Sequence, residues 1–225
     1  LLNSKVVNAF ALPGGFVYIS RGLLALMNDE AELASVLGHE VGHVTARHSA
    51  NRYNKTVFAG VLGAGVSIAT GSREAGELFS QTSQLWLLSY SRGHEFQSDE
   101  LGVRYMSRAG YDPYGAPRML DSLGRQTELD ARILGRDEAQ RIPAWARTHP
   151  LTEDRVRRAL ERAAAAPAGQ KVRRQDIFFD SIDGILYDDD PEQGVIRGHE
   201  FWHGDLGFTF EVPDGFALQN SETSV

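Results

Sequence analysis

Two histidines and a glutamate in the segment ASVLGHEVGHVTAR have the types and spacing of a metal-dependent hydrolase. His39, Glu40 and His43 form the pattern His-Glu-x-x-His. In a helix, residues four apart lie on one face, so both imidazoles can bind the same ion. Glu40 follows the first ligand. The ion lowers the pKa of a bound water, and Glu40 can then deprotonate that water. The pattern therefore predicts a zinc hydrolase with Glu40 as general base.

A second segment, Ser91 to Asp99, can complete such a site. Glu95 would give a His2Glu ligand set for one zinc ion and leave a fourth position open for water. Asp99 comes one helical turn later, where it can accept the ring N–H of a ligand imidazole and fix its tautomer. Without the first segment, the same two acids would be interpreted as a solvated pair on a helix surface. The chain has no cysteine, so a metal site must use histidine and carboxylate.

The five-residue pattern occurs a second time, at His199, Glu200 and His203. Gly198 and Gly204 flank it, and its surroundings alternate as a strand does. Positions four apart in a strand lie about 13 Å from one another, too far to bind one ion. We therefore expect this copy to be structural.

Three further histidines must be weighed as ligands. His48 comes five residues after His43 and is predicted to be a helix-end residue rather than a ligand. His94 is rotated by about 100° from its neighbour Glu95 on a helix, so we expect a surface or packing role. His149 precedes a proline and a capped helix, and by itself it is an ordinary loop histidine.

Helices form most of the predicted scaffold. Asn28 or Asp29 caps the helix that carries the first motif, where Gly38 and Gly42 each cost about 1 kcal/mol relative to alanine. That cost indicates close approach of another element on the glycine face. Further helices are expected over 21–27, 83–108, 113–130, 152–166 and 175–186. In the helix over 152–166, the arginines are expected to face solvent; they are Arg155, Arg157, Arg158 and Arg162.

Strands are predicted near both ends of the chain. Val6–Ala11 and Phe16–Ser20 are joined by Leu-Pro-Gly-Gly and indicate a hairpin. Residues 195–212 favour short strands. The small apolar residues that begin at 163 and end at 169 indicate a boundary between a domain over 1–168 and a small mixed extension over 169–225. The expected fold class is α+β and mostly helical.

Composition narrows the function. The content of 42% hydrophobic and 24% charged residues is typical of a globular protein with a core. A formal net charge of −7 with scattered basic residues argues against nucleic-acid binding. No signal peptide is visible, and the sequence is interpreted as truncated at both ends. The apolar stretch 57–71 is too short to span a bilayer and is left open as flap, core or membrane-facing segment.

The assembled motifs resemble one family of zinc metallopeptidases, which holds the CAAX prenyl endopeptidases and the HtpX-type membrane proteases. The likeness covers about residues 6 to 165 and is greatest to the soluble, BepA-like periplasmic members of bacteria. It rests on HEVGH with Arg47-His48, on Ser91-Arg92-x-x-Glu95-x-x-x-Asp99 with Glu100-Leu101-Gly102, and on VNAFALPGG, AGYDP and THPLTEDR. The resemblance implies a zincin-like core of the gluzincin type. It also implies zinc on His39, His43 and Glu95, with Glu40 as base.

Two more site assignments follow from the resemblance alone. It implies that His149 lies near the metal, where it either gates the open position or stabilises the oxyanion. It also implies an edge strand for substrate binding by β-addition, formed by Asn8, Ala9, Phe10 and Ala11.

The function implied is a zinc endopeptidase that cleaves misfolded or envelope polypeptides in the bacterial periplasm or cell envelope. Association with a membrane surface or an outer-membrane protein is compatible with that location. One alternative is a latent or chaperone-like peptide-binding module with an occluded metal site. Another is a non-haem iron oxygenase, because two histidines and one carboxylate also suit Fe(II).

Overall fold

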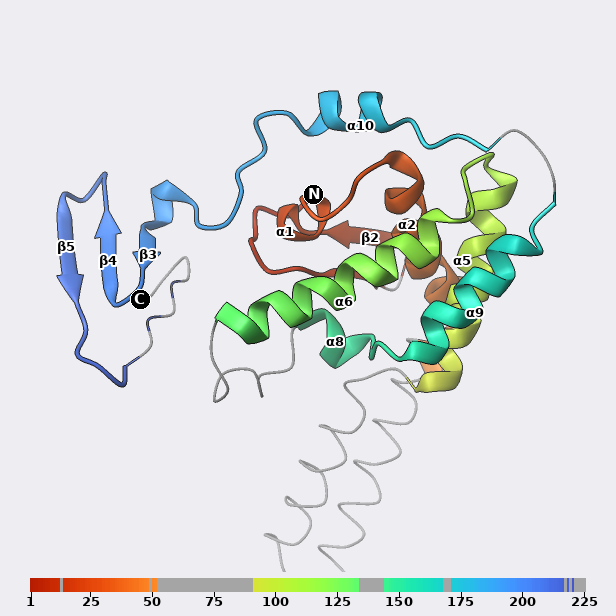
Figure 1. Cartoon of the computed structure of the whole chain (residues 1–225), viewed down its shortest axis with the longest axis horizontal. Coiled ribbons are helices and arrows are strands. Elements are labelled where there is room, and N and C mark those ends of the chain that lie inside the picture. The colour runs from red at the N-terminus through yellow and green to blue at the C-terminus, as the bar shows by residue number, and fades with distance from the viewer. Residues whose placement is uncertain are drawn as a thin grey trace, which may run out of the picture.

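The computed structural model describes residues 1–12, 14–48, 50–51, 91–133, 144–167, 171–216, 218 and 220. The apolar stretch 57–71 and the predicted helical start at 83 lie outside these residues. Helices dominate the described part, and two small antiparallel sheets accompany them, which confirms a mostly helical α+β fold (Figure 1). None of the described helices is long and apolar enough to span a bilayer.

The helix with the first motif, α2 (Glu30–Thr45), packs against α5 (Arg92–Arg108). A Cβ built on Gly38 would lie 3.0 Å from the backbone oxygen of Gly102, and one on Gly42 would lie 3.1 Å from the Cα of Ser98. The close approach predicted from the two glycines is therefore confirmed. This close contact brings the motif residues of α2 and α5 next to one another.

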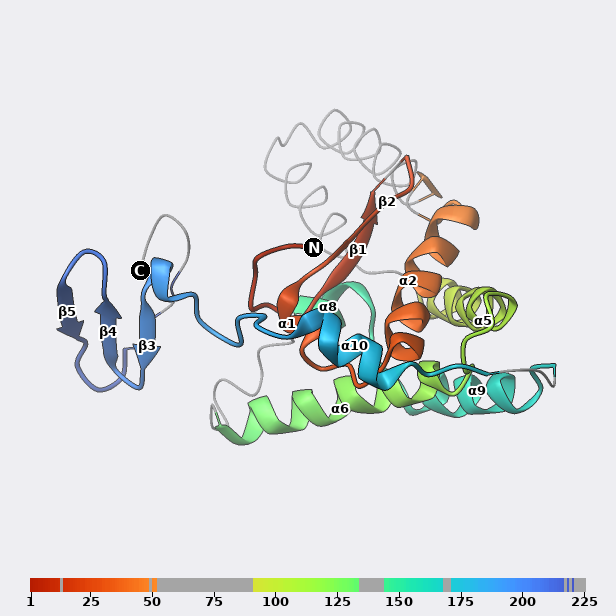
Figure 2. The same ribbon diagram turned by 90° about the horizontal axis from the view of Figure 1, so that it is seen from above.

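The predicted hairpin is present as β1 (Ala9–Leu12) and β2 (Phe16–Ile19), paired antiparallel from Ala9 with Ile19 to Leu12 with Phe16. Strand β1 begins three residues later than predicted, so Asn8 lies immediately before it. The Ser20 hydroxyl accepts from the backbone N–H of Asn8 and donates to its carbonyl, which holds this residue against the start of helix α1 (Arg21–Leu24). Figure 2 shows α2 between this hairpin and α5.

Three more helices close the domain: α6 (Gly115–Ile133), α8 (Ala144–Thr148) and α9 (Glu153–Ala164). The prediction that all four arginines of α9 face solvent is wrong for Arg155, which is 4% exposed. It shares a buried face with Ala159 and Ala163, four and eight residues on, and α5 covers this face. The other three arginines are exposed, as predicted.

The C-terminal residues form α10 (Gln175–Ile182), a 3-10 turn η1 (Pro191–Gln193), and a sheet of β3 (Val195–Arg197), β4 (Glu200–His203) and β5 (Phe208–Glu211). Helix α10 ends four residues earlier than expected. Phe178 of α10 is buried in one cluster with Leu23, Met27 and Trp145. Residues after the predicted boundary at 168 thus contribute to the helical core, and the division into two domains stays a prediction. The sheet lies apart from the helices (Figure 1).

Candidate metal centre

Three separate parts of the chain bring potential metal ligands to one point. Helix α2 supplies His39 and His43, α5 supplies Glu95, and His149 follows α8. One ligand atom from each of these four residues lies within 4.8 Å of all the others. Their convergence depends on the contact between α2 and α5, which the glycines permit.

The ligand atoms are as far apart as neighbouring ligands in the coordination sphere of one metal ion. The Nε2 atoms of His39 and His43 are 3.0 Å apart, and His43 Nε2 is 3.3 Å from Glu95 Oε1. His149 Nδ1 lies 3.2 Å from His39 Nε2 and 3.2 Å from Glu95 Oε1. Tetrahedral zinc with ligands near 2.05 Å separates them by about 3.3 Å. The described residues therefore fit zinc in size and in ligand type.

Hydrogen bonds assign the tautomer of each motif histidine. His39 Nδ1 lies 2.9 Å from Asp99 Oδ1, which can only accept, so Nδ1 carries the proton and Nε2 presents a lone pair. His48 Nε2 donates to Gln97 Oε1 at 3.0 Å, which leaves His48 Nδ1 as the acceptor for His43 Nδ1–H, also at 3.0 Å. His43 Nε2 is then a lone pair as well. With both Nε2 atoms presenting lone pairs, a metal cation between them would bind both.

Electrostatics of the site also favour a cation. Burial opposes ionisation of Glu95, but its contacts with the imidazoles of His149, His43 and His39 outweigh burial and hold the carboxyl pKa far below its usual range. Burial lowers the pKa of His43 to about 3, which keeps this imidazole neutral as a ligand must be. For His39, burial is outweighed by the hydrogen bond to Asp99 and by the charge of Glu95, and its pKa is raised.

Arg155 pairs with two carboxylates of the site. Its Nε and Nη2 each lie 2.8 Å from an oxygen of Asp99, and its Nη1 lies 2.8 Å from Glu95 Oε2. Glu95 Oε2 is nevertheless buried without a partner in hydrogen-bonding geometry. The Arg155 charge, together with hydrogen bonds, outweighs burial and lowers the pKa of Asp99. Glu40 is buried here as well, so one guanidinium faces the three carboxylates of Glu40, Glu95 and Asp99. A divalent cation would balance the excess negative charge.

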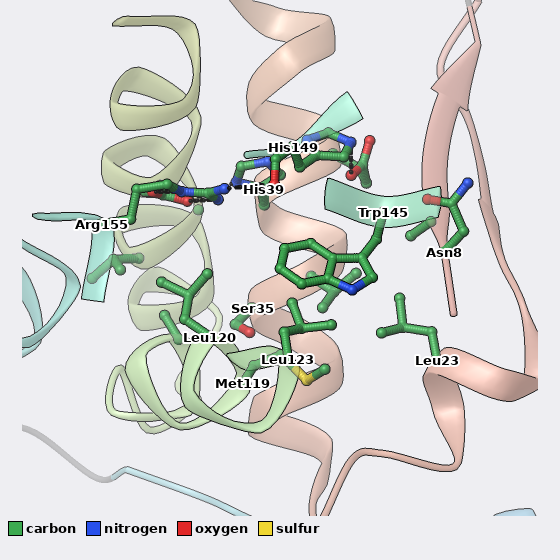
Figure 3. Close-up of a pocket in the computed structure, with 17 residues that line it drawn as sticks. Asn8, Leu23, Ser35, His39, Met119, Leu120, Leu123, Trp145, His149 and Arg155 are labelled. Carbon is green, nitrogen blue, oxygen red and sulfur yellow. Dashed lines mark hydrogen bonds and ion pairs between the residues drawn. The ribbon is translucent and has the colours of Figure 1, made fainter. Parts of the chain in front are cut away.

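Glu40 lies beside this cluster and lines a pocket with His39 and His149. Its Oε1 is 3.5 Å from His149 Nε2. Figure 3 shows His149 and His39 at one end of the pocket, with Trp145, Met119, Leu120 and Leu123 below them. A carboxylate so placed can exchange protons with a molecule that enters the pocket.

Sequence reasoning assigned no role to two residues that contact the site. Arg155 was expected in solvent, although the buried alanines at 159 and 163 mark its face. His48 was predicted as a helix-end residue and is not among the four convergent ligands, but it is 1% exposed and bonded to His43. Arg47 has a positive φ of 57°, which ends the α2 geometry and turns His48 back toward the motif.

The remaining histidines lie away from the convergent ligands. His94 stacks on His48 with ring centroids 4.2 Å apart, in agreement with a packing role. Glu200 and His203 of the second motif belong to β4, and His199 precedes that strand. This copy is not among the metal-binding groups of the described residues, and it has no helix to align its imidazoles.

Comparison with known proteins adds a family. Residues 1–163 match the profile of Peptidase family M48. The chain is 32% identical over 189 residues to a beta-barrel assembly-enhancing protease of Yersinia pestis, covering 80% of the chain and 37% of that protein. It is 36% identical over 126 residues to mitochondrial metalloendopeptidase OMA1 of Arabidopsis thaliana, covering 56% and 25%. The OMA1 of Schizosaccharomyces pombe is 34% identical over 166 residues, covering 72% and 45%. The chain thus spans less than half the length of each relative.

Proposed function

The chain belongs to peptidase family M48, a family of metal-dependent peptidases, and we propose that it is a zinc endopeptidase with a zincin-like core. The family match confirms the resemblance predicted from the sequence motifs. The proposed ligands of one zinc ion are His39, His43 and Glu95. The observation that carries this proposal is the set of ligand-atom distances, which match tetrahedral zinc, beside the buried carboxylate of Glu40.

Zinc in such a site polarises a carbonyl oxygen and lowers the pKa of a bound water. Glu40 is the proposed general base: it takes a proton from the attacking water and gives it to the leaving amine. Its burial between α2 and the pocket keeps bulk water from competing for that proton. His149 Nε2 lies 3.5 Å from Glu40 Oε1, close enough to share this proton.

The residues around the ligands have proposed positioning roles. Asp99 holds the Nδ1–H of His39, so the Nε2 lone pair points at the metal. Arg155 fixes Asp99 with two hydrogen bonds. His48 accepts the Nδ1–H of His43 in the same way, so the Nε2 lone pair of His43 also points at the metal; the acceptor here is a neutral imidazole instead of a carboxylate.

His149 is the proposed gate. Its Nδ1 is as close to His39 Nε2 and Glu95 Oε1 as another ligand would be, at 3.2 Å from each. In this conformation it takes the fourth position, which a substrate or water needs. A His149→Ala variant should then cleave faster than the wild type. A loss of cleavage would instead support the oxyanion-stabilising role.

The proposed substrates are unfolded or envelope polypeptides, held along β1 from Asn8, Ala9, Phe10 and Ala11 by strand addition. A periplasmic or cell-envelope location is proposed from the likeness to a beta-barrel assembly-enhancing protease. Association with an outer-membrane protein is part of the same proposal. Nothing in the comparisons favours a chaperone-like peptide-binding module.

The test compares the wild type with Glu40→Gln, loaded with one equivalent of zinc and incubated with unfolded casein. Glutamine keeps the shape of the side chain but cannot accept the proton, so the variant should retain zinc and lose cleavage. Metal analysis of both proteins separates loss of chemistry from loss of the ion. Normal cleavage by a zinc-loaded Glu40→Gln protein would contradict the mechanism. Iron in place of zinc in the wild type as purified, before zinc is added, would favour an oxygenase.

A further inference from the structure

A groove lies between the C-terminal half of α5 and the chain that follows α9. Figure 1 shows these two helices side by side. The chain after α9 pairs with the residues after α5, because Tyr111 and Val172 form a parallel bridge and the Val172 N–H donates to the Gly110 carbonyl at 3.1 Å. The groove has a volume of about 550 Å³, within the range of about 300–1,000 Å³ that is typical of small-molecule sites.

The floor of the groove is apolar. Val103 and Pro113 are buried there, and the remaining apolar lining comes from Tyr111, Ala165, Ala166 and Pro167. The two hydroxyls that line it are already engaged as donors: Ser107 donates to the Val103 carbonyl and Tyr111 donates to Glu30. An apolar ligand body would therefore meet a surface that offers it contacts and few competing polar groups.

Three exposed cations, Arg104, Arg108 and Lys171, line the same groove. Within the described part of the chain none of them has a carboxylate partner at ion-pair distance. The fourth cation of the lining, Arg162, is paired with Glu100 at 2.9 Å. Three positive charges are thus left uncompensated in one groove of a protein whose formal net charge is −7.

Two acids that adjoin the lining are unable to neutralise these cations. Glu30, which accepts from Tyr111, is paired with Arg174 at 3.3 Å. Asp112 is paired with Arg118 at 2.9 Å. The compensating negative charge must therefore come from a bound molecule or from solvent ions.

The arrangement of the cations suits a phosphate group. Arg104 and Arg108 are four residues apart on α5, so they lie on one face and repel each other unless an anion lies between them. Arg104 and Lys171 contact the rings of Tyr105 and Tyr114, at 5.5 and 5.7 Å from the centroids, and a contact with a ring face uses no N–H donor. A phosphate monoester offers three acceptor oxygens and up to two negative charges, whereas a carboxylate offers two oxygens and one charge. Guanidinium groups bind phosphate oxygens through two parallel hydrogen bonds.

We propose that this groove binds an anionic amphiphile, whose phosphate group lies between Arg104, Arg108 and Lys171 and whose apolar chain lies on Val103 and Ala166. A free alkyl or acyl phosphate and a phospholipid of a membrane share this chemistry. The two arginines come nine and thirteen residues after Glu95, or about 14 and 20 Å along α5, so the site is separate from the metal centre. The inference is independent of the proposed peptidase function.

The first experiment titrates the wild-type protein with octyl phosphate, below its micelle concentration, by isothermal titration calorimetry. Inorganic phosphate lacks the apolar chain and octyl glucoside lacks the charge, so each should bind at least about tenfold more weakly than octyl phosphate. If either control bound as tightly as octyl phosphate, the inference would be overturned.

One pair of variants tests the charged part of the groove. The double variant Arg104→Gln/Arg108→Gln should weaken octyl phosphate binding by at least about tenfold, because both guanidinium groups are lost. Its control, Arg125→Gln/Arg132→Gln, removes two exposed arginines from α6 and changes the net charge equally, and it should preserve binding. Equal affinities of the two double variants would contradict the role of Arg104 and Arg108.

A second pair tests the apolar floor. Ala166→Phe places a ring in the groove and should block the octyl chain, whereas Ala164→Phe, at an exposed position outside the lining, should not. Full binding of octyl phosphate by a folded Ala166→Phe protein would overturn the assignment of the groove.

Vesicles distinguish the two sources of the phosphate group. The protein is sedimented with vesicles of phosphatidylcholine, with and without phosphatidic acid. Sedimentation that requires phosphatidic acid and is lost in Arg104→Gln/Arg108→Gln would identify a membrane lipid as the ligand. Binding of octyl phosphate without sedimentation would identify a free amphiphile, and binding of neither would overturn the inference.

Discussion

Replacement of Arg155 by glutamine should destabilise the protein far more than replacement of Arg157, two residues away on the same helix. Arg155 is 4% exposed and makes three contacts of 2.8 Å with two carboxylates. Removal of one partner from a buried ion pair costs about 3–5 kcal/mol, because the other charge stays buried. Glu95 keeps contacts with two imidazoles, so the lower end of this range is expected.

Urea unfolding of the metal-free proteins measures this cost. A loss of about 3–5 kcal/mol lowers the midpoint by roughly 1–3 M, given a slope of about 1–3 kcal/mol per molar urea. Arg157→Gln removes an exposed arginine that pairs with Asp154 and Glu161, and it should leave the midpoint nearly unchanged. If Arg155→Gln shifted the midpoint no more than Arg157→Gln, the inferred role of the buried guanidinium would be wrong.

The pH dependence of this difference has a defined sign. Arg155 lowers the pKa of Asp99 in the folded protein, so the stability from this pair is fully present above the unfolded pKa of about 3.9. It is lost as the pH falls through the lower folded-state pKa. The gap between the wild type and Arg155→Gln should therefore be constant from neutral pH down to about 5 and narrow in stronger acid.

Three further predictions concern the second histidine, the helix contact and the metal. His48→Ala should lower zinc affinity by about 10–100-fold, because His43 loses the group that fixes its tautomer. Competition with a fluorescent zinc chelator measures the affinity, and an unchanged affinity would refute the role of His48. Gly38→Ala should lower the melting temperature, because the new Cβ would press on Gly102. As a control, Gly93→Ala should leave the melting temperature unchanged or raise it, because the atom nearest to its new Cβ would be Ser91 Oγ at 3.9 Å. Equal effects of the two substitutions would contradict the close helix contact. Chelation of zinc should lower the melting temperature in a way that added zinc reverses, as calorimetry can show, and no difference would argue against a structural contribution of the ion.

The helix contact could be predicted from the sequence because it depends on local preferences. Glycines at 38 and 42 in a helix interior cost free energy, and this cost indicated a neighbouring backbone, which is that of Gly102 and Ser98. The cap at Asp29 was equally readable, since its side chain accepts the backbone N–H of Glu32, three residues ahead. Such features need no knowledge of distant residues.

The missed residues depend on distant partners or on backbone geometry. Arg155 meets Asp99, 56 positions earlier, and an arginine on an amphipathic helix is usually solvated. In a continuous helix His48 would point away from His43, but the left-handed turn at Arg47 returns it. A positive φ at a non-glycine residue cannot be foreseen from helical periodicity.

Anomalous X-ray scattering above and below the zinc K edge, from crystals of the zinc-loaded protein, tests the central claim most directly. The proposed function predicts one strong anomalous peak per chain, within bonding distance of His39 Nε2, His43 Nε2 and a carboxylate oxygen of Glu95. A peak at another site, or none in a crystal grown with zinc, would contradict the assignment of this cluster as the catalytic metal centre.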